Sequence, residues 1–382
     1  MVRYFGCLAA VFGFLSMSVG QAQAQTKFWV YVGTYSGKKS DGIYVAPFDA
    51  ATGELGKATV AAKVTDPSFL AIHPTNKLLF CVCESNPKAG DEKIGVVSFQ
   101  MDTKTGKLVQ INGQPSIGAG PCHINCDRTG KFVLVANYGG GSTTVLPVAE
   151  NGKLLPASDF VQHKGSSVNS SRQKEPHAHS VNLTADNRFA MVADLGIDKV
   201  LIYQFDAEKG KITASNPAAL DMTPGDGPRH FAFHPTKPFA YVNNELTSSV
   251  TALKFDAKIG KLEKMGTLST LPEPVKGNST AEVAVHPSGK FVYVSNRGHN
   301  SIAIFHVDES SGELKAAGHQ KAGIAVPRNF CIDPTGKWLF CANQAKDNVI
   351  VFANDPTTGG LKPTKMKIYM GTPVCIRFVP QS

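Results

Sequence analysis

The residues of this chain that could do chemistry are histidines, arginines and a glutamate in short polar strings between apolar segments. His177 and His179 stand two positions apart, Arg229 and His230 are adjacent, and Glu245 follows them. A histidine or a carboxylate can take a proton from water, and an arginine can stabilise a developing oxyanion. These residues therefore predict general acid–base chemistry on a substrate that carries or develops negative charge.

Two further arginines, Arg297 and Arg328, stand in similar polar strings. If they meet Arg229 in a partly desolvated pit, the three cations are costly to bury without an anionic partner. Glu245 could neutralise one of them, and the others then indicate a bound carboxylate or phosphate. The alternative is a solvated rim of charges that binds nothing.

Metal or nucleophilic catalysis has weaker support in the sequence. His177, His179 and Asp194 could bind a metal ion, but no further ligand follows at a recognisable spacing, so we expect no metal. The chain has no nucleophile elbow, no cysteine–histidine signature and no HExxH motif. We therefore expect an activity that needs no cofactor.

The elements that position these residues come from one repeat of roughly fifty residues. Each unit has a short alternating run, usually opened by Pro, and then an aromatic and aliphatic strand after a polar turn. The paired runs are 67–74 with 78–82, 121–127 with 131–137, 176–181 with 188–193, 228–235 with 239–243, 280–287 with 291–296, and 327–334 with 338–343. A third strand and a Gly-containing turn follow, as in 301–305 and 311–314. Such short strands, without helical periodicity, predict an antiparallel blade.

The two ends of the chain complete the pattern. Residues 28–35 resemble the second strand of a unit and have no first strand before them, whereas residues 373–380 resemble a first strand with nothing after it. Pairing the ends would remove the exposed sheet edges of an open array. We therefore predict an all-β, seven-bladed β-propeller in which the C-terminal strand closes the N-terminal blade. A two-domain β-sandwich is the alternative.

This topology predicts which residues converge on one mouth of the central channel. The start of each first strand and the loop after each second strand lie at the same end of a blade. The first strands would bring His123, His177, His179, Arg229, His230, Glu282, Arg328 and Asn329 to this mouth. The loops would bring Glu84, Asn86, Asn137, Tyr138, Asp194, Asn243, Asn244, Glu245, Asn296, Arg297, His299, Asn343 and Gln344. His73, His234 and His286 fall in turns at the opposite end, so we expect them to be structural.

The N-terminal segment has the features of an export signal. Arg3 gives a positive start, residues 7–15 form a short apolar core, and Ala22-Gln23-Ala24 is a small-x-small pattern. We expect residues 1–24 to be a signal peptide cleaved after about Ala24, leaving 25–382 as one propeller domain in the periplasm or outside the cell. An uncleaved membrane anchor is the alternative, and no later stretch is apolar enough for a spanning helix.

Composition narrows the class of partner. The net charge of +9 favours anionic ligands weakly, and the lysines are scattered singly, so we expect no nucleic acid and, after signal cleavage, no membrane. We also expect a monomer. Seven cysteines follow the signal segment, most of them in apolar strands, and this indicates buried thiols with at most one or two disulfides.

Several strings, in order, resemble the bacterial 6-phosphogluconolactonase family of seven-bladed propellers, which also includes fungal carboxy-muconate lactonizing enzymes. They are Tyr31–Tyr35, Glu175–Ser180, Gly227–His230 with Phe233–Pro235, Asn243–Leu246, Ser295–Ile302 and Pro327–Phe330. The resemblance covers essentially the whole chain after the signal segment. It implies catalytic roles for His179 (or His177), Arg229, Glu245 and one of Arg297 and Arg328.

The resemblance implies hydrolysis of a sugar lactone. We expect His179 or Glu245 to activate water, Arg229 to stabilise the oxyanion, and His177, His230, Arg297 and Arg328 to bind a small anionic substrate. The family's substrate, 6-phosphogluconolactone of the pentose phosphate pathway, is cytoplasmic, so an exported chain points instead to an analogue. The alternatives are a muconate-type lactonizing cyclase and a periplasmic binding or scaffold propeller for a protein or glycan.

Overall fold

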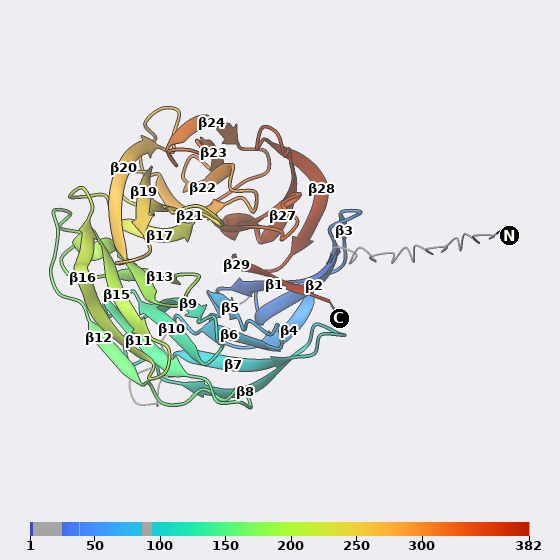
Figure 1. The fold of residues 1–382 in the computed structure, drawn as a ribbon, viewed down its shortest axis with the longest axis horizontal. Helices are drawn as coiled ribbons and strands as arrows, with labels where there is room; N and C mark the ends of the chain where they lie inside the picture. Colours follow the sequence, from blue (N-terminus) through green and yellow to red (C-terminus); the bar gives the residue numbers. More distant parts are fainter. Residues whose placement is uncertain (3–24, 38, 86–93, 382) are drawn as a thin grey trace.

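A computed structural model describes residues 1–2, 25–37, 39–85 and 94–381, and its strands form seven sheets around a central axis (Figure 1). The predicted signal peptide, 1–24, lies almost wholly outside the described residues, and so does Asn86, which the sequence placed at the mouth. The helical elements of the described chain are two 3₁₀ turns, η1 (Leu195–Ile197) and η2 (Gln344–Lys346). Within these residues, none of the helices has the length and apolar character needed to cross a bilayer.

Each sheet is one antiparallel blade. The first contains β1 (Lys27–Thr34), β2 (Gly42–Asp49), β3 (Glu54–Leu55), β4 (Thr59–Lys63) and β29 (Pro373–Pro380). The second contains β5 (Leu70–Ile72), β6 (Leu78–Val82), β7 (Val96–Met101) and β8 (Leu108–Gln114). The third contains β9 (Pro121–Cys126), β10 (Phe132–Asn137), β11 (Ser142–Pro147) and β12 (Asp159–Gln162). The fourth contains β13 (Ala178–Leu183), β14 (Phe189–Asp194), β15 (Lys199–Asp206) and β16 (Lys211–Asp221).

The remaining blades repeat this order. The fifth contains β17 (Pro228–Phe233), β18 (Phe239–Asn244), β19 (Ser249–Asp256) and β20 (Lys261–Ser269). The sixth contains β21 (Ser279–Val285), β22 (Phe291–Arg297), β23 (Ser301–Val307) and β24 (Leu314–Gln320). The seventh contains β25 (Pro327–Ile332), β26 (Trp338–Asn343), β27 (Asn348–Asn354) and β28 (Leu361–Tyr369).

The ring closes as the sequence predicts. Strand β29 pairs antiparallel with β1 from Phe28 with Pro380 to Thr34 with Pro373. The inner strands β5, β9, β13, β17, β21, β25 and β29 each contact the next, and β29 contacts β5. Figure 1 shows the red C-terminal strand beside the blue N-terminal strands. Closure leaves no inner strand at an open edge of the ring, so the seven-bladed prediction is confirmed.

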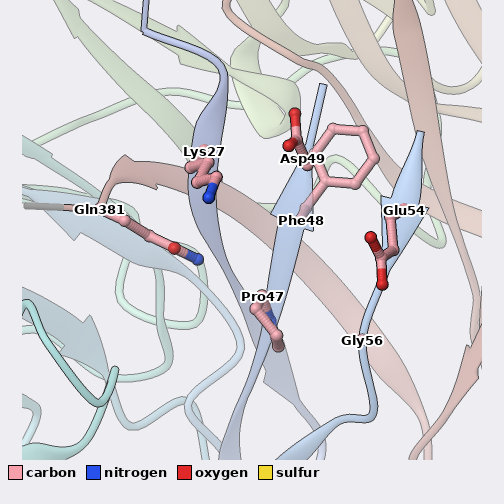
Figure 2. A pocket seen from close by; sticks show the side chains of 7 residues that line it. All are labelled: Lys27, Pro47, Phe48, Asp49, Glu54, Gly56 and Gln381. Atoms are coloured by element: carbon pink, nitrogen blue, oxygen red, sulfur yellow. The ribbon is translucent and has the colours of Figure 1, made fainter. Parts of the chain in front are cut away.

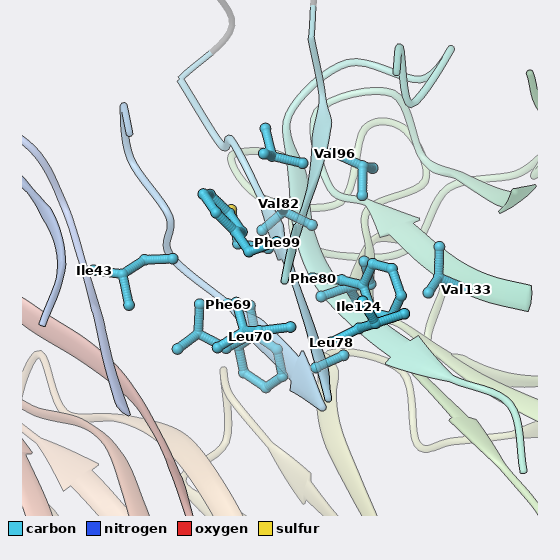
Figure 3. Close-up of a cluster of buried hydrophobic side chains, with 14 of the residues drawn as sticks. Ile43, Phe69, Leu70, Leu78, Phe80, Val82, Val96, Phe99, Ile124 and Val133 are labelled. Carbon is cyan, nitrogen blue, oxygen red and sulfur yellow. The ribbon is translucent and has the colours of Figure 1, made fainter. Parts of the chain in front are cut away.

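The hydrophobic core lies between neighbouring blades. One cluster, drawn in Figure 3, joins Ile43 of the first blade, Phe80 and Phe99 of the second and Val133 of the third. Another joins Phe48 of the first blade to residues of the seventh. Because each blade faces a neighbour on both sides, its strands are apolar on both faces, which explains the continuous apolar runs of the second strands.

The predicted structural histidines link neighbouring blades. Nε2 of His73, His234 and His286 lies 3.1, 3.1 and 2.8 Å from the carbonyl oxygens of Gly130, Gly289 and Gly336 in the next blade. These three glycines have φ of 75°, 77° and 76°, and a Cβ atom there would collide with the imidazole. The His-Pro turns therefore fasten the repeat together at the end opposite the predicted mouth.

Candidate functional site

A backbone irregularity near the start of the inner strands positions the site. In six blades the register with the second strand shifts by one residue. In five of them one inner-strand residue has no partner, and in the sixth Ala281 and Glu282 stand opposite Ser295. Such a β-bulge turns the side chain of the extra residue away from its normal direction. The five bulge residues are Cys122, His179, Arg229, Arg328 and Val374, and all of them line a single pit at the mouth.

The bulges correct one detail of the repeat. The sequence pattern aligned Pro176 with Pro228. In the structure, however, Ala178 is the residue of β13 that precedes the bulge, as Pro228 is in β17, so His179 corresponds to Arg229. His177 precedes the strand, stacks on Tyr138 at 4.5 Å between ring centroids, and has Nδ1 2.9 Å from the carbonyl oxygen of Tyr138. His179 lines the pit, whereas His177 lies beside it.

Glu245 is the centre of the charged cluster at the mouth. Its Oε2 accepts from Nε of Arg229 at 2.8 Å and from Nη2 of Arg297 at 3.1 Å, and its Oε1 accepts from Nη2 of Arg172 at 2.8 Å. Glu245 and Arg229 are 5% and 2% exposed. The predicted proximity of Arg229 and Glu245 is confirmed, and the carboxylate binds three guanidinium groups instead of one.

Those arginines determine the protonation of Glu245. Burial opposes its ionisation, but Arg297, Arg229 and Arg172 outweigh burial and lower the pKa of Glu245 to about 2. A carboxylate with so low a pKa, and with both oxygens engaged, is a weak acceptor for a proton from water. Its main physical effect is to fix the orientation of Arg229 and Arg297.

His179 is the second candidate base, and it is uncharged at neutral pH. Burial, followed by the charge of Arg229, places the pKa of His179 well below its usual 6.5. Its Nε2 lies 3.9 Å from Oε2 of Glu245, and its Nδ1 lies 3.7 Å from the sulfur of Cys122. A neutral imidazole beside a carboxylate can accept a proton, and the carboxylate then stabilises the resulting cation.

His230 forms the floor of the pit as part of a buried hydrogen-bond chain. Its Nδ1 donates to Oε1 of Glu282 at 2.9 Å, while Asn329 donates to Oε2 of the same carboxylate. Burial lowers the pKa of His230, although Glu282 offsets part of this effect. Oδ1 of Asn329 accepts from the backbone N–H of Ile376 in β29, so the hydrogen bonds link the four successive inner strands β17, β21, β25 and β29.

Arg328 differs from the other arginines of the pit because it has no hydrogen-bond acceptor among the described residues. Its guanidinium lies over the ring of Tyr35 at 5.2 Å. The Tyr35 hydroxyl donates to Glu84, whose two carboxylate oxygens lie 3.0 and 2.9 Å away. Arg328 lines the pit, whereas Arg297 supports Glu245 from behind, with Nη2 also donating to the carbonyl oxygen of Thr280 at 2.8 Å.

Arg172 is a site residue that the sequence did not indicate. It comes from the loop between β12 and β13, which lies outside the repeat, and its Nη2 also donates to the hydroxyl of Tyr138 at 3.0 Å. Gln173 anchors this loop, since it is fully buried and donates to the carbonyl oxygen of Leu195 at 2.8 Å. The only feature of the sequence that could have indicated Arg172 is the unusual length of the loop between β12 and β13.

Most of the asparagines predicted at the mouth are structural. Nδ2 of Asn137, Asn244, Asn296 and Asn343 donates to the residue that starts the third strand of the same blade, at 3.1, 2.8, 3.2 and 3.0 Å. These bonds close the loop after the second strand, so the asparagines position the mouth and do not line the pit.

Asp194 is also structural. Its Oδ2 lies 2.7 Å from Nδ1 of His163, and its Oδ1 accepts from the backbone N–H of His177 at 2.7 Å. Both side chains of the His163–Asp194 pair are fully buried. Asp194 is therefore turned away from His179, and the part of the chain that the structure describes holds no cluster of metal-ligating side chains.

The pit itself is narrow. It has a volume of about 10 Å³, which is room for one water-sized molecule. A wider pocket of about 210 Å³ lies near the two ends of the chain, between Lys27, Asp49, Glu54 and Gln381 (Figure 2). Its lining offers neither histidine nor arginine. All seven cysteines after residue 24 are free thiols.

Comparison with known proteins agrees with this geometry. The model of a family described as "Lactonase, 7-bladed beta-propeller" matches residues 29–378. A 6-phosphogluconolactonase of Bacillus subtilis strain 168 is 36% identical over 309 residues, which are 81% of this chain and 86% of that protein. A 6-phosphogluconolactonase of Formosa agariphila is 34% identical, over 80% and 86% of the two chains.

Two solved structures are similar over nearly the whole chain. A putative 6-phosphogluconolactonase of Bacteroides fragilis has a TM-score of 0.86 at 35% identity, covering 93% of this chain and 98% of that one. The periplasmic gluconolactonase PpgL of Pseudomonas aeruginosa has a TM-score of 0.87 at 31% identity, covering 94% and 100%. The chain therefore belongs to the lactonase family of seven-bladed β-propellers.

Proposed function

We propose that this protein hydrolyses a sugar lactone that carries an anionic group, at the mouth lined by His179, Arg229 and Arg328. The observation that carries the proposal is the arrangement of charge. Glu245 is the only carboxylate among the described residues within ion-pair distance of Arg172, Arg229 and Arg297, while Arg328 has no ion-pair partner there. A desolvated excess of guanidinium groups favours an anionic substrate and an anionic transition state.

His179 is the base in this mechanism. It is neutral, lines the pit and has Glu245 beside it, whereas the oxygens of Glu245 are already occupied by arginines. Water attacks the lactone carbonyl carbon while His179 takes its proton. The ring C–O bond then breaks, and the leaving ring oxygen takes the proton back from His179, so the imidazole ends as it began.

Arg229 stabilises the charge that develops on the carbonyl oxygen. Its Nε is held by Glu245 and its Nη1 donates to the carbonyl oxygen of Ala281, so Nη2 is the nitrogen left to face the substrate. A donor whose direction is fixed before the reaction needs no reorganisation in the transition state. Glu245 and Arg297 are positioning residues for this donor.

Arg328 binds the anionic group of the substrate. The names of the relatives point to a phosphate, as in 6-phospho-D-glucono-1,5-lactone, and PpgL is named for gluconolactone. We propose 6-phosphogluconolactone or an exported analogue with a carboxylate or phosphate. Since the pit holds one water-sized molecule, the lactone ring enters only when side chains at the mouth move aside.

A periplasmic binding or scaffold propeller is the competing function. It would be favoured by a wide mouth with apolar loops, whereas a narrow pit with arginines supports the enzyme. Turnover on a panel of lactones separates the two, and a carboxy-muconate in the same panel tests for a cyclising activity. Rates equal to spontaneous hydrolysis on every lactone would leave binding as the function.

We also propose that the protein is exported and acts as a monomer in the periplasm or outside the cell. The motif ending at Ala24 supports the first point, and the similarity to a periplasmic gluconolactonase agrees with it. Mass spectrometry of periplasmic or secreted protein should find an N-terminus near Gln25. Intact Met1 in the cytosol would contradict export and favour the cytoplasmic phosphorylated substrate.

A further inference from the structure

The larger cavity of the central channel lies below the pit, at the mouth with the His-Pro turns. It has a volume of about 260 Å³ and is lined by residues of six inner strands, by Phe69 directly before β5, and by Pro287 in the turn after β21. Much of its wall is apolar, with Phe231, Phe330 and Ile332, and its polar groups include Asn182 and Arg377. A concave, mostly apolar cavity with a few polar groups is typical of a small-molecule site.

The guanidinium of Arg377 lines this cavity without a direct ion pair, although the charge of Glu282 acts on it from farther away. Its Nε donates to the carbonyl oxygen of Leu70 at 3.0 Å, its Nη1 to that of Ile376 at 2.7 Å, and it stacks on Phe69 at 4.6 Å. Among the described residues no carboxylate lies within 4.0 Å of it. These contacts hold the guanidinium rigidly and leave Nη2 without a protein acceptor.

Aromatic rings separate this cavity from the pit above. Phe69 and His230 line both spaces, and His123 lies 4.1 Å from Phe69 and 5.3 Å from His230 between ring centroids. The ring of His179 lies 5.4 Å from that of His230, on the side of the pit. The lower cavity is therefore a separate space with its own entrance.

The chemistry of the lower cavity selects one class of ligand. A single unpaired guanidinium matches a single negative charge. Glu282 also lines the cavity, and although His230 and Asn329 occupy its oxygens, its charge disfavours a dianion such as phosphate. We propose that the lower half of the channel binds a small organic monocarboxylate, with the carboxylate on Arg377 and the apolar body against Phe231, Phe330 and Ile332.

Calorimetric titration of the purified protein with benzoate and with benzamide tests this site. The two probes have nearly the same shape and differ in charge. We expect benzoate to bind saturably in the millimolar range, which suits a ligand of this size, and benzamide to bind at least roughly tenfold more weakly. Arg377→Met should weaken benzoate binding by roughly tenfold or more.

Two further variants locate the binding event. Arg328→Met, which removes the unpaired cation of the upper pit, should leave benzoate binding unchanged. Ala284→Leu adds a bulkier side chain to the wall of the lower cavity without touching Arg377, so it should abolish binding even if Arg377→Met fails to fold. Equal binding of benzoate and benzamide, loss of binding in Arg328→Met, or no binding by the wild type would each overturn the proposal.

Discussion

Nε of Arg229 donates to Oε2 of Glu245 at 2.8 Å, and both side chains are almost completely buried. Arg229 is the bulge residue of β17, and Glu245 directly follows β18 in the same blade. The start of β17 and the end of β18 lie side by side in the antiparallel blade, so Arg229 and Glu245 meet at the mouth. Their pairing fixes the donor that faces the substrate in the proposed reaction.

Replacing Glu245 by Gln tests this pair. We expect turnover to fall by roughly 10²-fold or more, because Arg229 and Arg297 lose the group that orients them. From the sequence we would expect such a change to leave folding nearly unchanged. Because three guanidiniums depend on this carboxylate, we now expect a loss of about 3 kcal/mol in the free energy of unfolding.

The matched control for that variant is Glu263→Gln. Glu263 has a cationic partner too, Lys261 at 2.6 Å, but both side chains are about half exposed. This change should alter neither turnover nor the urea midpoint. A folded Glu245→Gln enzyme with full activity would remove Glu245 from the mechanism.

Replacing Arg328 by Met tests the substrate's charge. We expect kcat/KM for 6-phosphogluconolactone to fall by roughly 10- to 100-fold, since a hydrogen bond between two charged groups is lost, and kcat/KM for δ-gluconolactone to change little. Arg188→Met, at a half-exposed arginine paired with Asp186, is the control and should change neither value. Equal losses on both lactones would mean that Arg328 does not recognise an anionic group.

Buried neutral histidines should make the protein sensitive to mild acid. Burial, then the neighbouring His230 and Arg377, lower the pKa of His123 well below 6.5. The unfolded chain therefore binds a proton at about pH 6.5 that the folded protein does not, and stability falls as the pH drops below that value. Denaturant unfolding at several pH values should show that the free energy of unfolding falls less steeply with decreasing pH in His123→Gln than in the wild type. Identical slopes in the two proteins would contradict this role of His123.

Glu245 should add a second loss of stability at lower pH. Its pKa is about 2 in the folded protein against an ordinary value of 4.5. A lowered carboxyl pKa stabilises the folded state above about pH 4.5, and this contribution disappears as the pH falls toward 2. In Glu245→Gln, denaturant unfolding should show a smaller loss of stability over this pH range, while other carboxyl groups with lowered pKa values, such as Glu282, still contribute. An unchanged loss would contradict this assignment.

Backbone strain at the mouth gives a prediction about stability. Val326 has φ of 48°, in the left-handed region that a β-branched residue rarely adopts, and directly precedes Pro327 of β25. Val326→Gly should leave the free energy of unfolding equal or higher, because glycine adopts this conformation without strain. The neighbouring Ala325→Gly should lower it by about 0.5–1 kcal/mol through the freer unfolded chain, and equal losses would argue against strain at Val326.

The sequence predicted the ring, its closure and the Arg229–Glu245 pair because all three follow from strand order in an antiparallel repeat. It did not predict the bulges, which depend on the backbone path, and so it aligned His179 two positions away from Arg229. Nor did it predict Arg172, because a loop outside the repeat has no periodicity that fixes its position. The prediction that the asparagines line the mouth was wrong for another reason. A polar residue that closes a loop and one that binds a ligand have the same sequence pattern.

The most direct test of the account is the rate of ring opening of 6-phosphogluconolactone and δ-gluconolactone by the purified protein, followed by proton release against spontaneous hydrolysis. We predict saturable catalysis, with the higher kcat/KM on a lactone that carries an anionic group, and a loss of roughly 10²-fold or more in Arg229→Met. Rates equal to the spontaneous reaction on both substrates and on a wider lactone panel would contradict the proposed function.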